Sequence, residues 1–255
     1  MMSQISELQD TLKSLRFGET ADQISHLLEQ AEINDETYST FLMNVMNFEQ
    51  RRREEKKIER HLKWATFPFN KTLEQFDLTE QQSLSKKQFN QLKELLWIEQ
   101  LYNLILLGPP GVGKTHLAVG LGIKAIYQGY KVIFTSMGEL IHTLKTEEIT
   151  RQSQTRMKRI RNADLVIIDD LMFIAMNQNE ANLFFHLINE LYNNASIILT
   201  SNKAPKEWGE LLGDPAITTA ILDRIMHRAE IIHLNDDSYR MKHRTSIFEG
   251  ESVSN

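Results

Sequence analysis

Residues 108–115 read Gly-Pro-Pro-Gly-Val-Gly-Lys-Thr; they follow the apolar run 103–107 and open an amphipathic helix. Glycines let the backbone curl so that its N–H groups point at phosphate oxygens, and the helix N-terminus adds a positive dipole. An ordinary glycine turn is the alternative, and the strand-loop-helix context argues against it. We therefore expect ATP to bind at Gly108, Pro109, Pro110, Gly111, Val112, Gly113, Lys114 and Thr115. Lys114 would contact the β- and γ-phosphates, and the Thr115 hydroxyl would bind Mg²⁺.

Polar residues end the two apolar runs that lie further along the chain. Asp169 and Asp170 follow the run 165–168, and Asn202 follows the run 196–200 by two residues. A carboxylate at a strand end can hold Mg²⁺, and the next one can polarise an attacking water. We assign Asp169 to the metal, Asp170 to the water and Asn202 to positioning the water or sensing the γ-phosphate. Taken alone, both patterns also fit strands that enter solvated turns.

Short apolar runs alternate with amphipathic helices beyond residue 66, which is typical of a parallel sheet covered by helices on both faces. The runs are 103–107, 131–135, 165–168, 196–200 and 230–233. They predict an α/β domain over residues 67–250 with a five-stranded parallel sheet, followed by a polar tail at 251–255. Such sheets bind ligands at the carboxyl ends of their strands, where all the motifs above fall.

The first 66 residues show apolar positions at helical spacing and predict a small all-helical domain. Thr20 and Asn34 are its predicted N-caps. The third helix is expected to continue to about Trp64, where Phe67-Pro68-Phe69 breaks the pattern. We interpret residues 1–66 as a partner-binding domain.

Composition excludes several classes of protein. The chain has 255 residues, of which 41% are hydrophobic and 25% charged, and it has no cysteine. Disulfides and thiolate metal sites are therefore excluded. No run of about 18 apolar residues occurs, and residues 1–16 lack the pattern of a signal peptide. We expect a cytoplasmic protein without a membrane segment.

Charge is distributed unevenly, although the formal net charge is only -5. Residues 1–50 are net -7, whereas 51–63 are net +4 and 151–161 are net +5. Basic clusters are typical of phosphate-backbone binding, with an exposed charged helix as the alternative. The predicted DNA contacts are Arg151, Arg156, Lys158, Arg159 and Arg161. The 51–63 cluster is a weaker candidate, because Glu54, Glu55 and Glu59 can pair along a helix with Lys57 and Lys63.

Together these motifs resemble the AAA+ ATPases of the IstB/DnaC type over about residues 67–245. The resemblance is carried by Trp97-Ile98-Glu99, GPPGVGKTHLA at 108–118, Asp169-Asp170, Thr200-Ser201-Asn202 and Leu222-Asp223-Arg224. GKTHLA and Tyr239-Arg240 fit both branches of the family. The chain length, the short helical N-terminal domain and the helix before Thr200 favour the IstB branch.

The resemblance implies roles for further residues. The nucleotide-binding segment extends to His116, and Asn202 is a sensor. Arg224 is an arginine finger that reaches the γ-phosphate of a neighbouring subunit, so it acts only in a homo-oligomer. Arg228 is a rival for that role, and Arg240 is similar to a second sensor that contacts the subunit's own nucleotide. Solvated surface arginines are the alternative for all three.

The resemblance also implies a function. An AAA+ ATPase of this kind oligomerises on double-stranded DNA with ATP and Mg²⁺ and helps an IstA-like transposase to select its target. Initiator-like AAA+ proteins carry a helix that lines the nucleic-acid channel where this chain has residues 151–161. A helicase loader of the DnaC type would instead grip single-stranded DNA. A monomeric nucleotide switch or small-molecule kinase is an alternative of another class, and it needs no arginine finger.

The sequence departs from the family pattern after the two carboxylates. Leu171-Met172-Phe173 stands where the family continues Leu-Gly, and Asp170 stands where a glutamate is common. The aspartate has a shorter reach to the attacking water. We therefore expect hydrolysis to be slow or to need stimulation by a partner.

Overall fold

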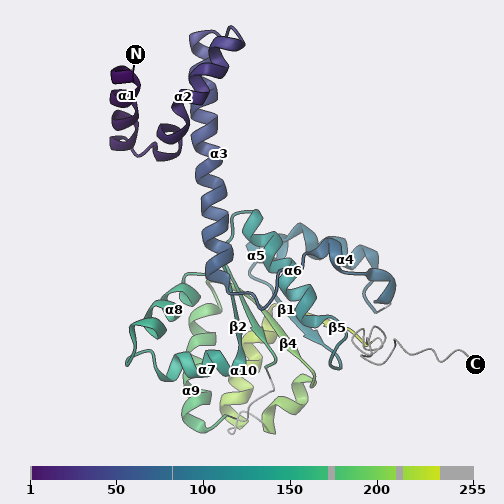
Figure 1. Ribbon diagram of the computed structural model, residues 1–255. Coiled ribbons are helices and arrows are strands. Elements are labelled where there is room, and N and C mark those ends of the chain that lie inside the picture. The colour runs from purple at the N-terminus through teal and green to yellow at the C-terminus, as the bar shows by residue number, and fades with distance from the viewer. Residues whose placement is uncertain (1, 82, 172–175, 211–214, 236–255) are drawn as a thin grey trace, which may run out of the picture. The chain divides into compact units, whose positions relative to one another are not determined.

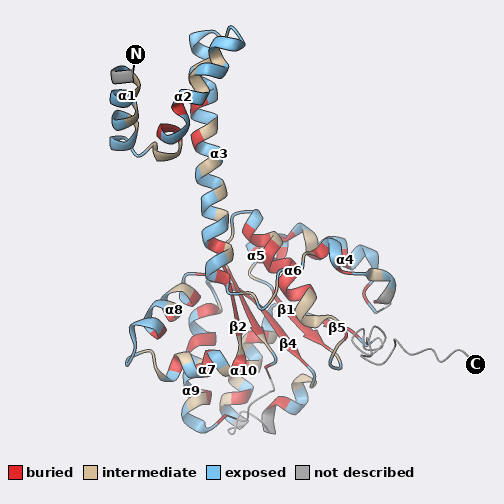
Figure 2. Ribbon diagram, viewed as in Figure 1, coloured by how far each residue is buried: buried red, intermediate tan, exposed pale blue. Residues whose placement is uncertain are grey.

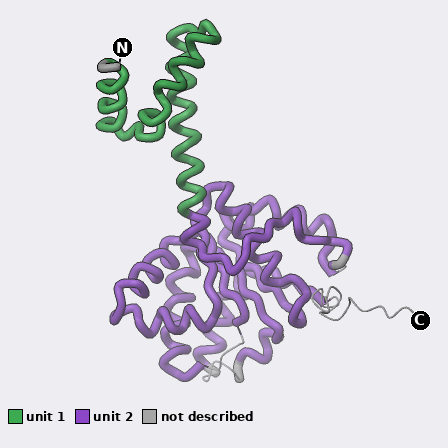
Figure 3. The backbone as a smooth tube through the Cα atoms, viewed as in Figure 1, with its two compact units in different colours: residues 1–60 green, residues 61–255 purple. Residues whose placement is uncertain are grey.

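The computed structural model of the protein describes residues 2–81, 83–171, 176–210 and 215–235. It divides the chain into two compact units, an N-terminal unit of residues 1–60 and a C-terminal unit of residues 61–255 (Figure 3). The boundary predicted at residue 66 follows the end of α3, Tyr38–Ala65. The partner-binding role of residues 1–66 stays a prediction.

A five-stranded parallel sheet forms the centre of the C-terminal unit, as the sequence predicts (Figure 1). The strand order is β2-β3-β4-β1-β5, and all four pairings are parallel. The strands are β1 Asn103–Leu107, β2 Val132–Ser136, β3 Leu165–Asp169, β4 Ser196–Ser201 and β5 Ala229–His233. Parallel strands place their carboxyl ends at one edge, so the loop after β1 lies beside the ends of its neighbours.

Helices cover both faces of this sheet (Figure 1). One face carries α6, Lys114–Tyr127, and the other carries α7 Met137–Lys145, α8 Arg151–Arg161, α9 Gln178–Leu191 and α10 Pro215–His227. Side chains alternate between the faces. Ile168 belongs to the core under α7 to α10, whereas Ile167 lies against Gly122 of α6, where an added Cβ would come within 2.8 Å of it. Strands β1 to β4 are accordingly buried on both sides, whereas the edge strand β5 is partly exposed (Figure 2).

Shorter elements lead into the sheet along the chain. They are the 3-10 helices η1 Leu73–Gln75 and η2 Leu78–Glu80, and the helices α4 Lys86–Glu94 and α5 Leu96–Glu99. A further 3-10 helix, η3 Pro205–Glu210, lies between β4 and α10. The segment 69–81, which contains η1 and η2, matters most for function because it forms part of the site described below.

The N-terminal unit is helical, with α1 Met2–Ser14, α2 Gly18–Ile33 and the first part of α3. The predicted N-caps are wrong: α2 begins before Thr20, and Asn34 is the C-cap of α2. The buried Glu49 of α3 explains the first error, since its carboxylate accepts hydrogen bonds from the Thr20 N–H at 3.0 Å and hydroxyl at 2.8 Å. A residue distant in sequence thus caps α2. Of the helices in the described ranges, none is both long and apolar enough to cross a membrane.

Candidate functional site

The glycine loop between β1 and α6 has the backbone conformation that the motif requires. Gly111 and Gly113 have φ values of 88° and 97°, in the region that favours glycine. Gly108 has no room for a side chain, because an added Cβ would lie 2.0 Å from the Leu234 carbonyl oxygen. Each glycine is therefore needed for the shape of the loop.

The N-terminus of α6 faces this loop. Gly113 is the N-cap of α6 and has no side chain to accept the first N–H groups of the helix, which makes them suitable donors to phosphate. The Lys114 ammonium donates to the carbonyl oxygens of Gly108 at 2.7 Å and Pro109 at 2.9 Å. The charge of Lys114 is thus held at the loop that would surround the phosphates.

Two strands and the helix α6 meet at the carboxylate of Asp169, at the end of β3. Its Oδ1 accepts hydrogen bonds from the Thr115 hydroxyl of α6 at 2.9 Å and from the Thr200 hydroxyl of β4 at 2.7 Å. Hydroxyl and carboxylate oxygens are the ligands that Mg²⁺ prefers. Thr115 and Asp169 therefore fit the predicted Mg²⁺ site, and Thr200 fixes the orientation of the carboxylate.

The next carboxylate, Asp170, is also positioned by Thr200. Its backbone N–H donates to the Thr200 hydroxyl at 2.8 Å, and its φ of 56° turns the chain sharply at the end of β3. Asp170 is exposed, so its carboxylate can contact water. Asn202 is also exposed, just after the neighbouring strand β4. The sequence predicted Asp169 and Asp170 but assigned no role to Thr200, which connects them.

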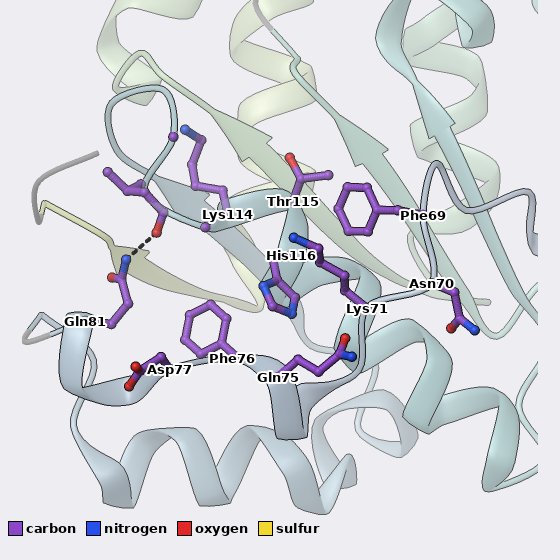
Figure 4. A pocket seen from close by; sticks show the side chains of 13 residues that line it. Phe69, Asn70, Lys71, Gln75, Phe76, Asp77, Gln81, Lys114, Thr115 and His116 are labelled. Carbon is purple, nitrogen blue, oxygen red and sulfur yellow. Dashed lines mark hydrogen bonds between the residues drawn. The ribbon is translucent and has the colours of Figure 1, made fainter. Parts of the chain in front are cut away.

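The segment 69–81 forms a wall opposite the glycine loop. Together they line a cavity of about 530 Å³ (Figure 4). Phe76 packs against Phe89 with ring centroids 5.7 Å apart, and the side-chain amide of Gln81 donates to the Val112 carbonyl of the loop. An aromatic and amide-lined wall beside a phosphate loop suits a nucleotide base. Sequence reasoning missed this wall, because no spacing rule links it to the glycines.

His116 lies in the same cavity (Figure 4). Its Nε2 is 3.1 Å from the Thr72 carbonyl oxygen, and its ring is 5.3 Å from the ring of Phe76 in an edge-on arrangement. Burial lowers the pKa of His116 below its ordinary value, and Lys71 adds to this effect, while the contact with Thr72 opposes it. His116 therefore stays neutral near pH 7 and serves as a packing and hydrogen-bonding group.

The comparison with known proteins agrees with this geometry. Residues 10–247 match the family described as IstB-like ATP binding protein. A putative ATP-binding protein of insertion sequence IS21 from Pseudomonas aeruginosa is 40% identical, over 93% of this chain and 90% of that protein. The chain belongs to this IstB-like family. An IS21-like putative ATP-binding protein from Bacteroides fragilis is 36% identical, over 99% of this chain and 96% of that protein.

The IstB-like chain also has a solved structural relative. The replication initiator DnaA bound to AMPPCP and single-stranded DNA aligns with a TM-score of 0.54 and 25% identity, covering 69% of this chain and 54% of that one. The fold is that of the AAA+ P-loop proteins, as the resemblance implied. The chain is therefore an ATP-binding AAA+ protein of the insertion-sequence type.

The predicted arginine finger, Arg224, lies on α10 and contacts α9. Its Nε donates to the Asn189 side chain at 2.9 Å, and its guanidinium lies 4.8 Å from the centroid of the Phe185 ring. The side chain of Arg228 is exposed and makes no hydrogen bond or ion pair within the described ranges. Arg240 lies outside the described residues. The catalytic roles of these arginines stay predictions.

The five basic residues of α8 do not share one environment. Arg161 bonds to Glu147 and Glu190, and these hydrogen bonds raise its pKa. Arg156 is half-buried and donates to the Phe134 carbonyl at 2.6 Å, at the edge strand β2. Arg159 stacks over Trp64 at 4.7 Å. Arg151 and Lys158 are exposed, and their side chains have no partner in the part of the chain that the structure describes.

Proposed function

We propose that this chain is an ATPase that assembles on duplex DNA with ATP and assists a transposase. The convergence of Thr115, Asp169 and Thr200 supports hydrolysis most directly, because it brings a Mg²⁺-binding pair to the phosphate loop. Membership of the IstB-like family supports the link to transposition. The partner would be an IstA-like transposase, and the place of action the cytoplasm.

Each residue of the site has a separate role in ATP hydrolysis. Lys114 and the loop N–H groups bind the phosphates, and Asp170 holds and orients the attacking water. Asn202, just after the neighbouring strand β4, senses the γ-phosphate. Thr115 and Asp169 would hold Mg²⁺, which would supply positive charge to stabilise the phosphates during transfer. Loss of Asp170 should therefore stop hydrolysis while leaving ATP binding intact.

Completion of the site requires a second subunit. A finger supplied in trans stabilises the charge that develops on the γ-phosphate, and Arg224 is our candidate. Its contacts with Asn189 and Phe185 hold the guanidinium at the surface of α10 and α9, where a neighbouring copy could approach it. ATP between subunits would then favour assembly, and hydrolysis would favour disassembly.

DNA contact is assigned to α8. Arg151 and Lys158 are the strongest candidates of the five, because their charges are unpaired within the described residues. Arg159 adds a guanidinium beside Trp64, whereas Arg156 and Arg161 mainly hold α8 in place. Contacts to phosphates carry little sequence information, which suits selection of targets by DNA deformability.

A mixing experiment tests this proposal. Arg224→Ala and Asp170→Ala should each hydrolyse ATP poorly. In an equal mixture, about a quarter of the interfaces join an intact site to an intact finger, so activity should return to that extent. Arg228→Ala tests the rival finger in the same way. Full activity of both arginine variants would favour the monomeric switch or kinase, and preference for single-stranded DNA would favour the helicase loader.

A further inference from the structure

The N-terminal unit contains a basic hollow, of which the sequence reveals only the part that lies in the 51–63 cluster. It has a volume of about 490 Å³ and lies between the end of α1, the start of α2 and the middle of α3. Six of the eight Lys and Arg residues of positions 1–60 line it, but only two of the twelve Asp and Glu residues do. The basic residues are Lys13, Arg16, Arg53, Lys56, Lys57 and Arg60. Folding thus concentrates positive charge in an acidic unit.

We propose that this basic hollow binds the phosphate backbone of duplex DNA, so that the N-terminal unit holds DNA in addition to α8. The inference rests on the proposed function, in which the chain assembles on DNA. It gives the N-terminal unit a nucleic-acid contact that neither the family description nor the relatives' descriptions contain.

A buried carboxylate holds the frame of the hollow. Glu49 accepts hydrogen bonds from Thr20 and from Arg53, whose Nε lies 2.7 Å from it. Burial raises the pKa of Glu49, but these bonds outweigh it and the pKa lies below its ordinary value. The start of α2 and the middle of α3 are therefore joined by an ionised group. The basic side chains extend from a preorganised surface.

Two of the basic groups are available to a ligand. Arg53 is committed to Glu49 and to the Arg16 carbonyl, and Lys56 is paired with Glu19. The side chains of Arg16 and Lys57, by contrast, have no partner among the residues that the structure describes. The pairing expected between Lys57 and Glu54, three residues before it, is absent there, and Glu54 instead accepts a hydrogen bond from the Gln50 side chain at 3.1 Å.

The lining favours nucleic acid over a peptide partner. Of the described residues that line the hollow, Gly18 alone carries no charge. Protein partners bind mainly through buried aromatic and aliphatic anchors, and among the described residues no aromatic or large aliphatic side chain lines the hollow to pack against them. Phosphate backbones need only closely spaced positive groups, which the hollow supplies. An acidic peptide is therefore the weaker candidate.

The salt dependence of duplex DNA affinity tests whether the basic hollow contacts phosphates. Each phosphate contact contributes about 0.9 to the slope of log affinity against log salt concentration. In the full-length protein with ATP, Arg16→Ala/Lys57→Ala should lower the slope for duplex DNA by about 1.8. The matched control is Arg51→Ala/Lys63→Ala, which removes two exposed charges outside the hollow. Thermal denaturation checks that both variants fold.

Lysine acetylation footprinting gives a second, local readout. Duplex DNA should protect Lys57 in the wild-type protein more than it protects Lys63. An unchanged slope in the hollow variant, with a reduced slope in Arg151→Ala/Lys158→Ala, would overturn the inference and leave the proposed function standing. Protection of Lys57 by poly-glutamate but not by DNA would also overturn it, in favour of an acidic peptide. No binding of duplex DNA by the wild type would overturn both proposals.

Discussion

The glycine loop and helix α8 were equally visible in the sequence, but the structure treats them differently. The glycines of the loop act through backbone geometry: Gly108 must pass the Leu234 carbonyl, and Gly113 must begin α6. The five bases of α8 looked equivalent, yet Arg161 bonds to two glutamates while Lys158 is exposed. Motifs fixed by backbone conformation can be read locally, whereas the role of a charged side chain depends on distant residues.

The largest expected effect tests whether the glycine loop is sufficient for ATP hydrolysis without support from Thr200. Thr200→Val removes the hydroxyl that donates to Asp169 and accepts from the Asp170 N–H. Because residues that orient metal ligands are worth roughly 10- to 100-fold in activity, the ATP hydrolysis rate should fall by about that factor. Steady-state ATPase assays measure it. Thr200→Ser keeps the hydroxyl and should retain most activity, and equal activity of both variants would mean that the loop suffices alone.

The second prediction distinguishes basic residues of α8 that contact DNA from those that stabilise the fold. Lys158→Ala should lower the salt slope of duplex DNA binding by about 0.9 and leave stability unchanged. Arg161→Ala should do the opposite: it loses a partly exposed network with Glu147 and Glu190, worth about 1 kcal/mol in the free energy of unfolding. Salt titrations of DNA binding and denaturant unfolding separate the two. Equal changes in slope would show that both side chains contact phosphate.

The smallest effect concerns His116, the residue that ends the nucleotide-binding segment. Burial lowers its pKa, so its NMR titration midpoint should lie below about 6.5. Between that midpoint and pH 6.5 the unfolded chain binds more protons than the folded chain, so stability should decrease as the pH falls. The difference in unfolding free energy between wild type and His116→Gln isolates this contribution. A midpoint above 6.5 would contradict the buried, neutral assignment.

Much of the sheet followed from sequence because strand pattern and loop chemistry are local. The apolar runs, the glycine loop and the Asp169-Asp170 pair could all be read directly. Thr200 and the wall containing Phe76 could not, because their roles arise from contacts between segments far apart in the chain. The N-cap at Thr20 was wrong for the same reason, since Glu49 caps α2 from α3.

Helical spacing also overstated burial in the N-terminal unit. Tyr38, Leu42 and Met46 follow the pattern of an apolar face, yet they are 95%, 57% and 42% exposed within the described structure. Spacing identifies a helix, but it does not say whether another element is available to cover its apolar side. The same limit explains why the sequence showed only the 51–63 part of the basic hollow, which α1, α2 and α3 form together.

Nucleotide-dependent binding of duplex DNA tests the central claim most directly. Gel shifts should compare ATP, ADP and no nucleotide for the wild type, Lys114→Ala and Asp170→Ala. We predict that the wild type binds duplex DNA with ATP but not with ADP or without nucleotide. Lys114→Ala should lose this binding because it cannot hold the phosphates, whereas Asp170→Ala should retain it. Equal binding of the wild type in all three nucleotide states would contradict the account, because ATP would then have no part in assembly.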